Sequence, residues 1–220
     1  MSGHYRDQLR DQPLDVEFLC EETVYSGFRD YSVAELRHAR LGEGRPIGPM
    51  KREFLTIGEV AIIIPYDPRR DSIVVIRQFR LGAAKLTPNG AAIELPAGLV
   101  DPGETADETA ARELTEETGL EALAIERCFS LLPSPGMLLE HANFYLAIVD
   151  ASNLAYKAGE ADEHEDIHPI LAPVDDILAA VDEGRVLNGF LITGLHWFAR
   201  KGRARAQALQ GTLFDDQEGT

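Results

Sequence analysis

Short apolar runs, several of them rich in Val and Ile, recur along most of the chain and are separated by turn residues. The two clearest runs, 59–66 and 72–79, are joined by Asp67-Pro-Arg-Arg-Asp, which predicts a central β-hairpin. Shorter runs before them, with a Gly- and Pro-rich stretch at 41–49, predict an antiparallel arm at the N-terminus. The predicted strands are 16–20, 23–27, 31–38, 53–57, 59–66, 72–79, 93–97, 124–131, 143–149 and 168–173.

Helices are predicted at 107–118, 174–183 and 188–200. The first has the clearest boundaries, because Thr105 followed by Glu108 has the pattern of a capping box and Gly119 supplies a stop. Strands with helices segregated between them predict an α+β sandwich. We expect residues 1–57 to form the N-terminal arm, 58–200 the main domain and 201–220 a flexible tail.

Charge and composition narrow the possible functions. With 37 Asp and Glu against 21 Lys and Arg, the net charge is −16, which opposes binding to nucleic acid. The longest apolar run, 60–65, is far shorter than the roughly 20 residues of a membrane span. The first residues lack the apolar core of a signal peptide, and Cys20 and Cys128 form no disulfide or metal motif, so we expect a cytoplasmic protein.

The predicted helix 107–118 carries an unusual density of carboxylates. A solvated face accounts for Asp107 and Glu108, but Glu113, Glu116 and Glu117 follow i, i+3, i+4 spacing and project from one face. Like charges at this spacing destabilise a helix unless a cation compensates them. Carboxylate oxygens are the ligands that Mg²⁺ and Mn²⁺ prefer, so the pattern predicts a metal site.

The surrounding sequence makes this pattern specific. Gly98 is followed after five residues by Glu104, and after seven more by Arg112-Glu113-Leu114-Thr115-Glu116-Glu117-Thr118-Gly119-Leu120. This arrangement resembles the Nudix box, the metal-binding loop–helix–loop of the Nudix hydrolases, at every defining position. An ordinary acidic helix does not require these constrained positions.

The resemblance extends to the ADP-ribose pyrophosphatase branch of that family and covers about residues 16–200. It rests on Ser134-Pro135-Gly136 beyond the box, on Gln78-Phe79-Arg80, on Glu94-Leu-Pro-Ala-Gly and on the acidic stretch 162–166. The resemblance implies an α/β/α Nudix sandwich with a mixed central sheet, an N-terminal antiparallel β arm and a homodimer.

Metal ligands and catalytic groups follow from the same resemblance. It implies that Glu113, Glu117 and the carbonyl of Ala97 hold two or more Mg²⁺ ions, with Mn²⁺ as an alternative. Glu116 joins them directly or through water, and Arg112 holds the glutamates in position. The late acidic loop supplies the general base: we favour Glu163 as base and Glu165 as metal ligand, although sequence alone leaves the two interchangeable. The alternative is that this loop is a solvated acidic turn.

Substrate contacts are expected from both parts of the chain. Arg52 and Arg80 are placed to meet a diphosphate, with a plain ion-pair role as the alternative. Phe28 or Tyr31 in the arm is expected to stack on adenine across a dimer interface, or else to pack in the core. Glu140 is expected to bind the terminal ribose, or a metal through water.

One departure from the branch lies between Gly136 and Glu140. Met137-Leu138-Leu139 stands where small or polar residues are usual. Either these side chains enter the core, or the pocket that they border takes something other than free ribose.

The resemblance implies Mg²⁺-dependent hydrolysis of ADP-ribose to AMP and ribose 5-phosphate. The first alternative is another nucleoside diphosphate sugar, such as ADP-glucose or GDP-mannose. The second is a Nudix-fold sensor that binds ADP-ribose-like ligands without turning them over, which the complete set of box carboxylates disfavours.

Overall fold

The computed structural model describes residues 9–159 and 165–218, and the chain divides into two compact units. Unit 1 contains residues up to Ile57 together with Ser134–Leu139. Unit 2 contains Gly58–Pro133 and the chain from Glu140 onward. Each unit is described below by itself.

Unit 1 is an antiparallel sheet of β1 (Val16–Ser26), β2 (Asp30–His38) and the first half of β3 (Ile47–Asp67). The strands predicted at 16–20 and 23–27 form the single strand β1, whose pairing with β2 contains two register shifts. Likewise 53–57 and 59–66 form one strand, with Gly58 at φ +108° between them. The predicted N-terminal β arm is confirmed.

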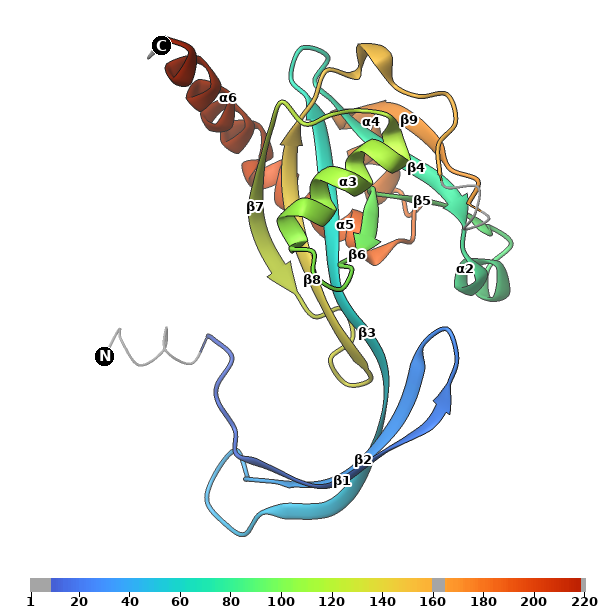
Figure 1. Ribbon diagram of the computed structural model, residues 1–220, viewed down its shortest axis with the longest axis vertical. Coiled ribbons are helices and arrows are strands. Elements are labelled where there is room, and N and C mark those ends of the chain that lie inside the picture. The colour runs from blue at the N-terminus through green and yellow to red at the C-terminus, as the bar shows by residue number, and fades with distance from the viewer. Residues whose placement is uncertain (1–8, 160–164, 219–220) are drawn as a thin grey trace. The chain divides into compact units, whose positions relative to one another are not determined.

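Unit 2 contains the rest of β3 and the strands that pair with it (Figure 1). β3 pairs with β4 (Ser72–Phe79), β6 (Ala97–Leu99) and β8 (Leu138–Ile148), and β8 also pairs with β7 (Ala124–Leu131). β4 pairs further with β5 (Ala91–Glu94) and β9 (His168–Pro173). The predicted hairpin is confirmed by the pairing of Tyr66 with Ile73.

Helices cover both faces of this sheet. Helix α3 (Ala106–Thr118) buries Ala110 and Leu114 in a cluster that includes Ile63, and Figure 1 shows it crossing the sheet. Helix α5 (Gly189–Trp197) places Gly194 against Ile64. Because neighbouring strand residues point to opposite faces, α3 and α5 lie on opposite sides. The α+β sandwich is confirmed.

The remaining helices differ more from the expectations. Helix α4 (Val174–Asp182) begins at the predicted residue, whereas the six-residue helix α2 (Leu81–Leu86) was not predicted. A short 3-10 helix, η1, occupies Ala151–Asn153.

Past α5 the chain stays helical through η3 (Phe198–Gly202) and α6 (Arg203–Glu218), where the sequence predicted a flexible tail from 201. Arg203 pairs with Asp71 at 2.8 Å and Arg205 with Glu126 at 2.6 Å. These partners are distant in sequence, which is why local patterns missed the anchored start of α6.

In the described ranges, none of the helices combines the length and the apolar character needed to cross a lipid bilayer.

The close approach of α5 to the sheet gives a test of the packing. A Cβ on Gly194 would lie 2.7 Å from Leu95 Cδ1, and Leu95 is itself buried. We expect Gly194→Ala to lower the free energy of unfolding by about 1–2 kcal/mol, because overpacking outweighs the gain in helix propensity. Urea denaturation measures this, with Gly189→Ala as control because a Cβ there meets nothing within 4 Å. Equal stability of the two variants would contradict this packing.

Candidate active site

Helix α3 is fixed at both ends and along one face, and this determines where its carboxylates point. Thr105 accepts a hydrogen bond from the Glu108 amide at 3.3 Å, and Glu108 accepts one from the Thr105 amide at 2.8 Å. Gly119 ends the helix in the left-handed conformation, with φ +71°. The predicted capping box and stop are thus confirmed. Since Leu114 is fully buried, the helix cannot rotate without losing its core contacts.

Glu117 is the most buried of the three stacked glutamates, with 3% of its surface exposed. Its Oε2 accepts a hydrogen bond from the Ala97 amide at 2.8 Å. Burial, together with the neighbouring carboxylates of Glu113 and Glu165, raises the pKa of Glu117 to about 8. The interior therefore holds a carboxylate whose ionised form needs a nearby positive charge.

Glu113 lies against strand β6, where the absence of a side chain at Gly98 is essential. A Cβ at position 98 would overlap the Glu113 carboxylate. Burial raises the pKa of Glu113, and the carboxylates of Glu116 and Glu165 add to this effect. The first glycine of the sequence motif is therefore needed for space, since its side chain position is taken by the glutamate.

Arg112 binds three carboxylates at the edge of this group. Its Nη1 donates to Glu113 at 2.7 Å and to Glu116 at 2.8 Å, and its Nε donates to Glu104 at 3.0 Å. Hydrogen bonds from Arg112 and Thr109 lower the pKa of Glu104 to about 2. Arg112 is thus positioned to orient Glu113 and Glu116, and Glu104 holds the arginine from the other side.

The late loop approaches the C-terminal half of α3. The Gly159 amide donates to the Glu116 carbonyl at 3.4 Å, and Ala158 pairs with Ile167 in an isolated bridge. Glu165 is half-buried and lies close enough to raise the pKa of both Glu113 and Glu117. Glu163, the predicted base, lies outside the described residues.

These groups fit a divalent cation. Glu113, Glu117 and Glu165 offer carboxylate oxygens, and the Glu165 carboxylate disfavours the ionised forms of the other two, which a divalent cation would stabilise. Among the described residues no three carboxylate, His or Cys side chains stand together as a ready-formed metal site. Arg112 forms ion pairs with Glu113 at 2.7 Å and with Glu116 at 2.8 Å.

Arg80, predicted as a substrate contact, directly follows β4 and is the N-cap residue of α2. Its Nε and Nη2 donate to Glu94 at 3.0 and 2.8 Å, so the ion-pair alternative describes part of its environment. The carboxylates of Glu117 and Glu165 also interact electrostatically with the Arg80 guanidinium. Arg80 therefore lies near the proposed metal ligands. The sequence motif includes the segment that begins at Glu94, but nothing in the sequence assigns Glu94 a role.

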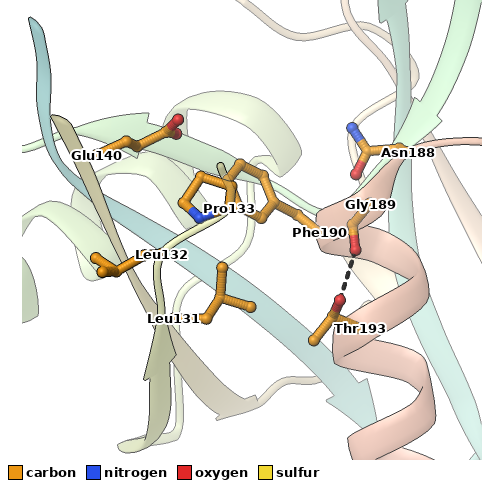
Figure 2. Close-up of a pocket in the computed structure, with 8 residues that line it drawn as sticks. All are labelled: Leu131, Leu132, Pro133, Glu140, Asn188, Gly189, Phe190 and Thr193. Carbon is orange, nitrogen blue, oxygen red and sulfur yellow. Dashed lines mark hydrogen bonds between the residues drawn. The ribbon is translucent and has the colours of Figure 1, made fainter. Parts of the chain in front are cut away.

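Glu140 lines a pocket of about 430 Å³ at the start of α5 (Figure 2). Figure 2 shows its carboxylate on one side of the pocket and Asn188 on the other, with Pro133 and Phe190 between them. Burial raises the pKa of Glu140. Within the described part of the chain its carboxylate has no hydrogen-bond partner, so it can accept a hydrogen bond from a ligand. The full lining is Leu131, Leu132, Pro133, Glu140, Asn188, Gly189, Phe190 and Thr193.

Phe28, Tyr31 and Arg52 belong to unit 1, whereas the groups described above belong to unit 2. The Phe28 ring is 89% exposed, with the Arg29 guanidinium 4.3 Å from its centre. Tyr31 donates a hydrogen bond to Glu53, and the exposed Arg52 donates to the Lys51 carbonyl at 2.9 Å. Core packing, the alternative expected for Phe28, is therefore wrong.

The apolar residues before Glu140 also belong to unit 1, up to Leu139. The Met137 carbonyl accepts a hydrogen bond from the Leu55 amide at 2.9 Å, so the main chain is held by β3. The side chains of Met137 and Leu139 are each 52% exposed. These two side chains therefore do not enter the core.

Comparisons with known proteins agree with this geometry. The sequence profile described as the NUDIX domain matches residues 56–188. ADP-ribose pyrophosphatase of Escherichia coli strain K12 is 33% identical over 183 residues, covering 83% of this chain and 87% of the relative. GDP-mannose pyrophosphatase of Citrobacter koseri is 33% identical over 148 residues, covering 67% of this chain and 76% of the relative.

A solved structure described as an ADP compounds hydrolase superposes with a TM-score of 0.64 at 21% identity, over 88% of this chain and all of the other. This likeness supports the fold. The matched profile covers more than half of the chain and includes the α3 carboxylates, Gly98 and Arg112. The chain therefore belongs to the Nudix hydrolase family.

Proposed function

We propose that this chain hydrolyses the diphosphate of ADP-ribose to AMP and ribose 5-phosphate, with Mg²⁺ as cofactor. The observation that carries the proposal is the buried Glu117 carboxylate beside the Ala97 amide, with Glu113 and Glu165 close to it. Relatives named ADP-ribose pyrophosphatase match 83% of the chain, whereas the relative named GDP-mannose pyrophosphatase matches 67%. The longer match favours ADP-ribose as the substrate.

Glu113, Glu117, Glu165 and the carbonyl of Ala97 are the proposed ligands of two or more Mg²⁺ ions, with Mn²⁺ as the alternative. When bound, such ions neutralise charge on the diphosphate and make an attacking water more acidic. The raised pKa values of Glu113 and Glu117 support this assignment, because a cation restores the ionised forms that burial disfavours.

Other side chains are assigned the remaining roles in the reaction. Arg112 holds Glu113 and Glu116 by hydrogen bonds, and Glu116 joins the ligands directly or through water. Glu163 removes the proton from the attacking water as general base. Arg80 meets the negative charge of the diphosphate, and Glu140 accepts a hydrogen bond from the terminal ribose.

Unit 1 supports a further part of the proposal, a cytoplasmic homodimer in which the arm contributes Phe28 and Arg52 to substrate binding. Its sheet leaves many large apolar side chains in solvent, which is typical of an interaction surface. They are Val16, Phe18, Leu19, Val24, Tyr25 and Phe28. Light scattering is expected to give twice the chain mass of 24.2 kDa, and a single-chain mass at micromolar concentration would contradict the dimer.

Substrate turnover tests the central proposal directly. Purified protein with Mg²⁺ is expected to convert ADP-ribose to AMP and ribose 5-phosphate, both identified by chromatography. ADP-glucose and GDP-mannose, assayed in parallel, are expected to react with lower kcat/KM. Preference for GDP-mannose would replace the proposed substrate, and tight binding of ADP-ribose without turnover would establish the sensor alternative.

Glu117→Gln tests the buried carboxylate through stability as well as activity. A carboxylate whose pKa is raised from 4.5 to about 8 stabilises the fold in its protonated form, and that contribution is lost as pH rises through about 8. In EDTA at pH 8.5 we therefore expect Glu117→Gln to have a higher Tm than the unmodified protein. Mg²⁺ is expected to raise the Tm of the unmodified protein only, and kcat of the variant to fall by roughly 100-fold.

A matched variant separates the ligand from the base in these assays. Glu163→Gln is expected to lower kcat while the rise of Tm with Mg²⁺ persists, because a general base is not required to hold the metal. Loss of the Mg²⁺ response in Glu163→Gln, with retention in Glu165→Gln, would exchange the roles of these two residues. An unchanged Mg²⁺ response in Glu117→Gln would refute its role as ligand.

A further inference from the structure

Glu94 is a buried carboxylate to which the site described above gives no role. It is the last residue of β5 and has only 6% of its surface exposed. Three side chains donate to it, from two parts of the chain that are far apart in sequence. They are Arg80 at 2.8–3.1 Å, Gln78 at 3.4 Å and Asn188 at 2.9 Å.

Arg80 is held by only part of its guanidinium. Nε and Nη2 face Glu94, whereas Nη1 has no hydrogen-bond partner among the described residues. The side chain is 48% exposed. The planar guanidinium therefore has one edge fixed by Glu94 and one edge able to donate to an anion, a geometry suited to phosphate oxygens.

The position of this pair connects it with both parts of the proposed site. The carboxylates of Glu117 and Glu165 interact electrostatically with the Arg80 guanidinium, so this side chain lies near the proposed metal ligands. On the other side, Asn188 donates to Glu94 and accepts a hydrogen bond from the Leu191 amide at 2.8 Å, which caps α5. Asn188 also lines the pocket that contains Glu140.

We propose that Glu94 is a positioning residue, which fixes the Arg80 guanidinium so that its free edge meets the substrate diphosphate. The inference rests on the proposed function, because Arg80 is assigned to the diphosphate there. A purely structural ion pair has no need of a partner with a free, solvent-facing donor edge. Without Glu94, the four-bond side chain of Arg80 must be ordered by the substrate itself, and binding weakens accordingly.

The first experiment is a double-mutant cycle of Glu94→Gln and Arg80→Ala, with ADP-ribose and Mg²⁺. Glu94→Gln is expected to raise KM about tenfold with kcat changed less than twofold, because ground-state binding is lost. In the Arg80→Ala background the same substitution is expected to change KM less than twofold. An equal rise of KM in both backgrounds would overturn the inference, since Glu94 would then act without Arg80.

Calorimetric binding of ADP in EDTA repeats the cycle without turnover or metal. The Kd for ADP is expected to rise about tenfold in Glu94→Gln and to be insensitive to that substitution once Arg80 is alanine. If the unmodified protein binds ADP with this pattern but does not hydrolyse ADP-ribose, the proposed function fails and the positioning role stands. If it hydrolyses ADP-ribose and the cycle is additive, only the positioning role fails.

Two further variants serve as controls. Glu126→Gln breaks another arginine–glutamate pair, a more exposed one in which Arg205 donates to Glu126 at 2.6 and 2.9 Å, and is expected to leave KM unchanged. Glu94→Asp keeps the charge on a shorter side chain and is expected to raise KM less than Glu94→Gln does. If Glu94→Gln does not fold, the cycle is run with Glu94→Asp, and additivity there counts equally against the proposal.

Discussion

Mutual repulsion among carboxylates on one face of α3 is the constraint around which unit 2 is organised. Glu117 is buried beside Ala97, and Glu113 fills the space that a side chain at Gly98 would occupy. Burial raises the pKa of both groups, so their ionised forms exist at a cost that the fold must offset. Leu114 and the capped helix ends offset it, because they hold α3 in an orientation that electrostatics alone would disfavour.

Cations in unit 2 are arranged in response to the same repulsion. Arg112 donates to three glutamates, and Arg80 is paired with Glu94 while it lies close to Glu117. In a chain with a net charge of −16, well-held arginines such as these offer local attraction to an anionic group. Under the proposed function, they act together with the metal to bind the diphosphate.

The sequence was most informative where local spacing determines geometry. The stacked glutamates, the Thr105 cap, the Gly119 stop and the central hairpin depend on neighbours within a few residues, and all were predictable. The interaction of Glu104 with Arg112 also lies within one motif. The motif predicts a glycine at position 98. The reason that no side chain fits there, the overlap with Glu113, depends on the three-dimensional structure.

What the sequence could not reveal depends on contacts between distant segments. Glu94 receives a hydrogen bond from Asn188, 94 residues later, and no local pattern marks that pair. Arg203 donates hydrogen bonds to Asp71, which is 132 residues earlier in the chain. Local sequence patterns therefore predict a flexible tail where α6 begins. The roles of Phe28 and Arg52 depend on partners beyond their own sheet, and they stay predictions.

The strand β3 and the segment Ser134–Leu139 have a consequence for how the chain can be divided. β3 runs from unit 1 into unit 2 without a linker, and Ser134–Leu139 returns to unit 1 from the middle of unit 2. A gene fragment that starts at Gly58 would thus still encode Ser134–Leu139 but not the segment with which it groups, and the Met137 carbonyl would lose the hydrogen bond from the Leu55 amide. The arm is therefore no detachable module, and recombination between relatives would have to exchange both segments together.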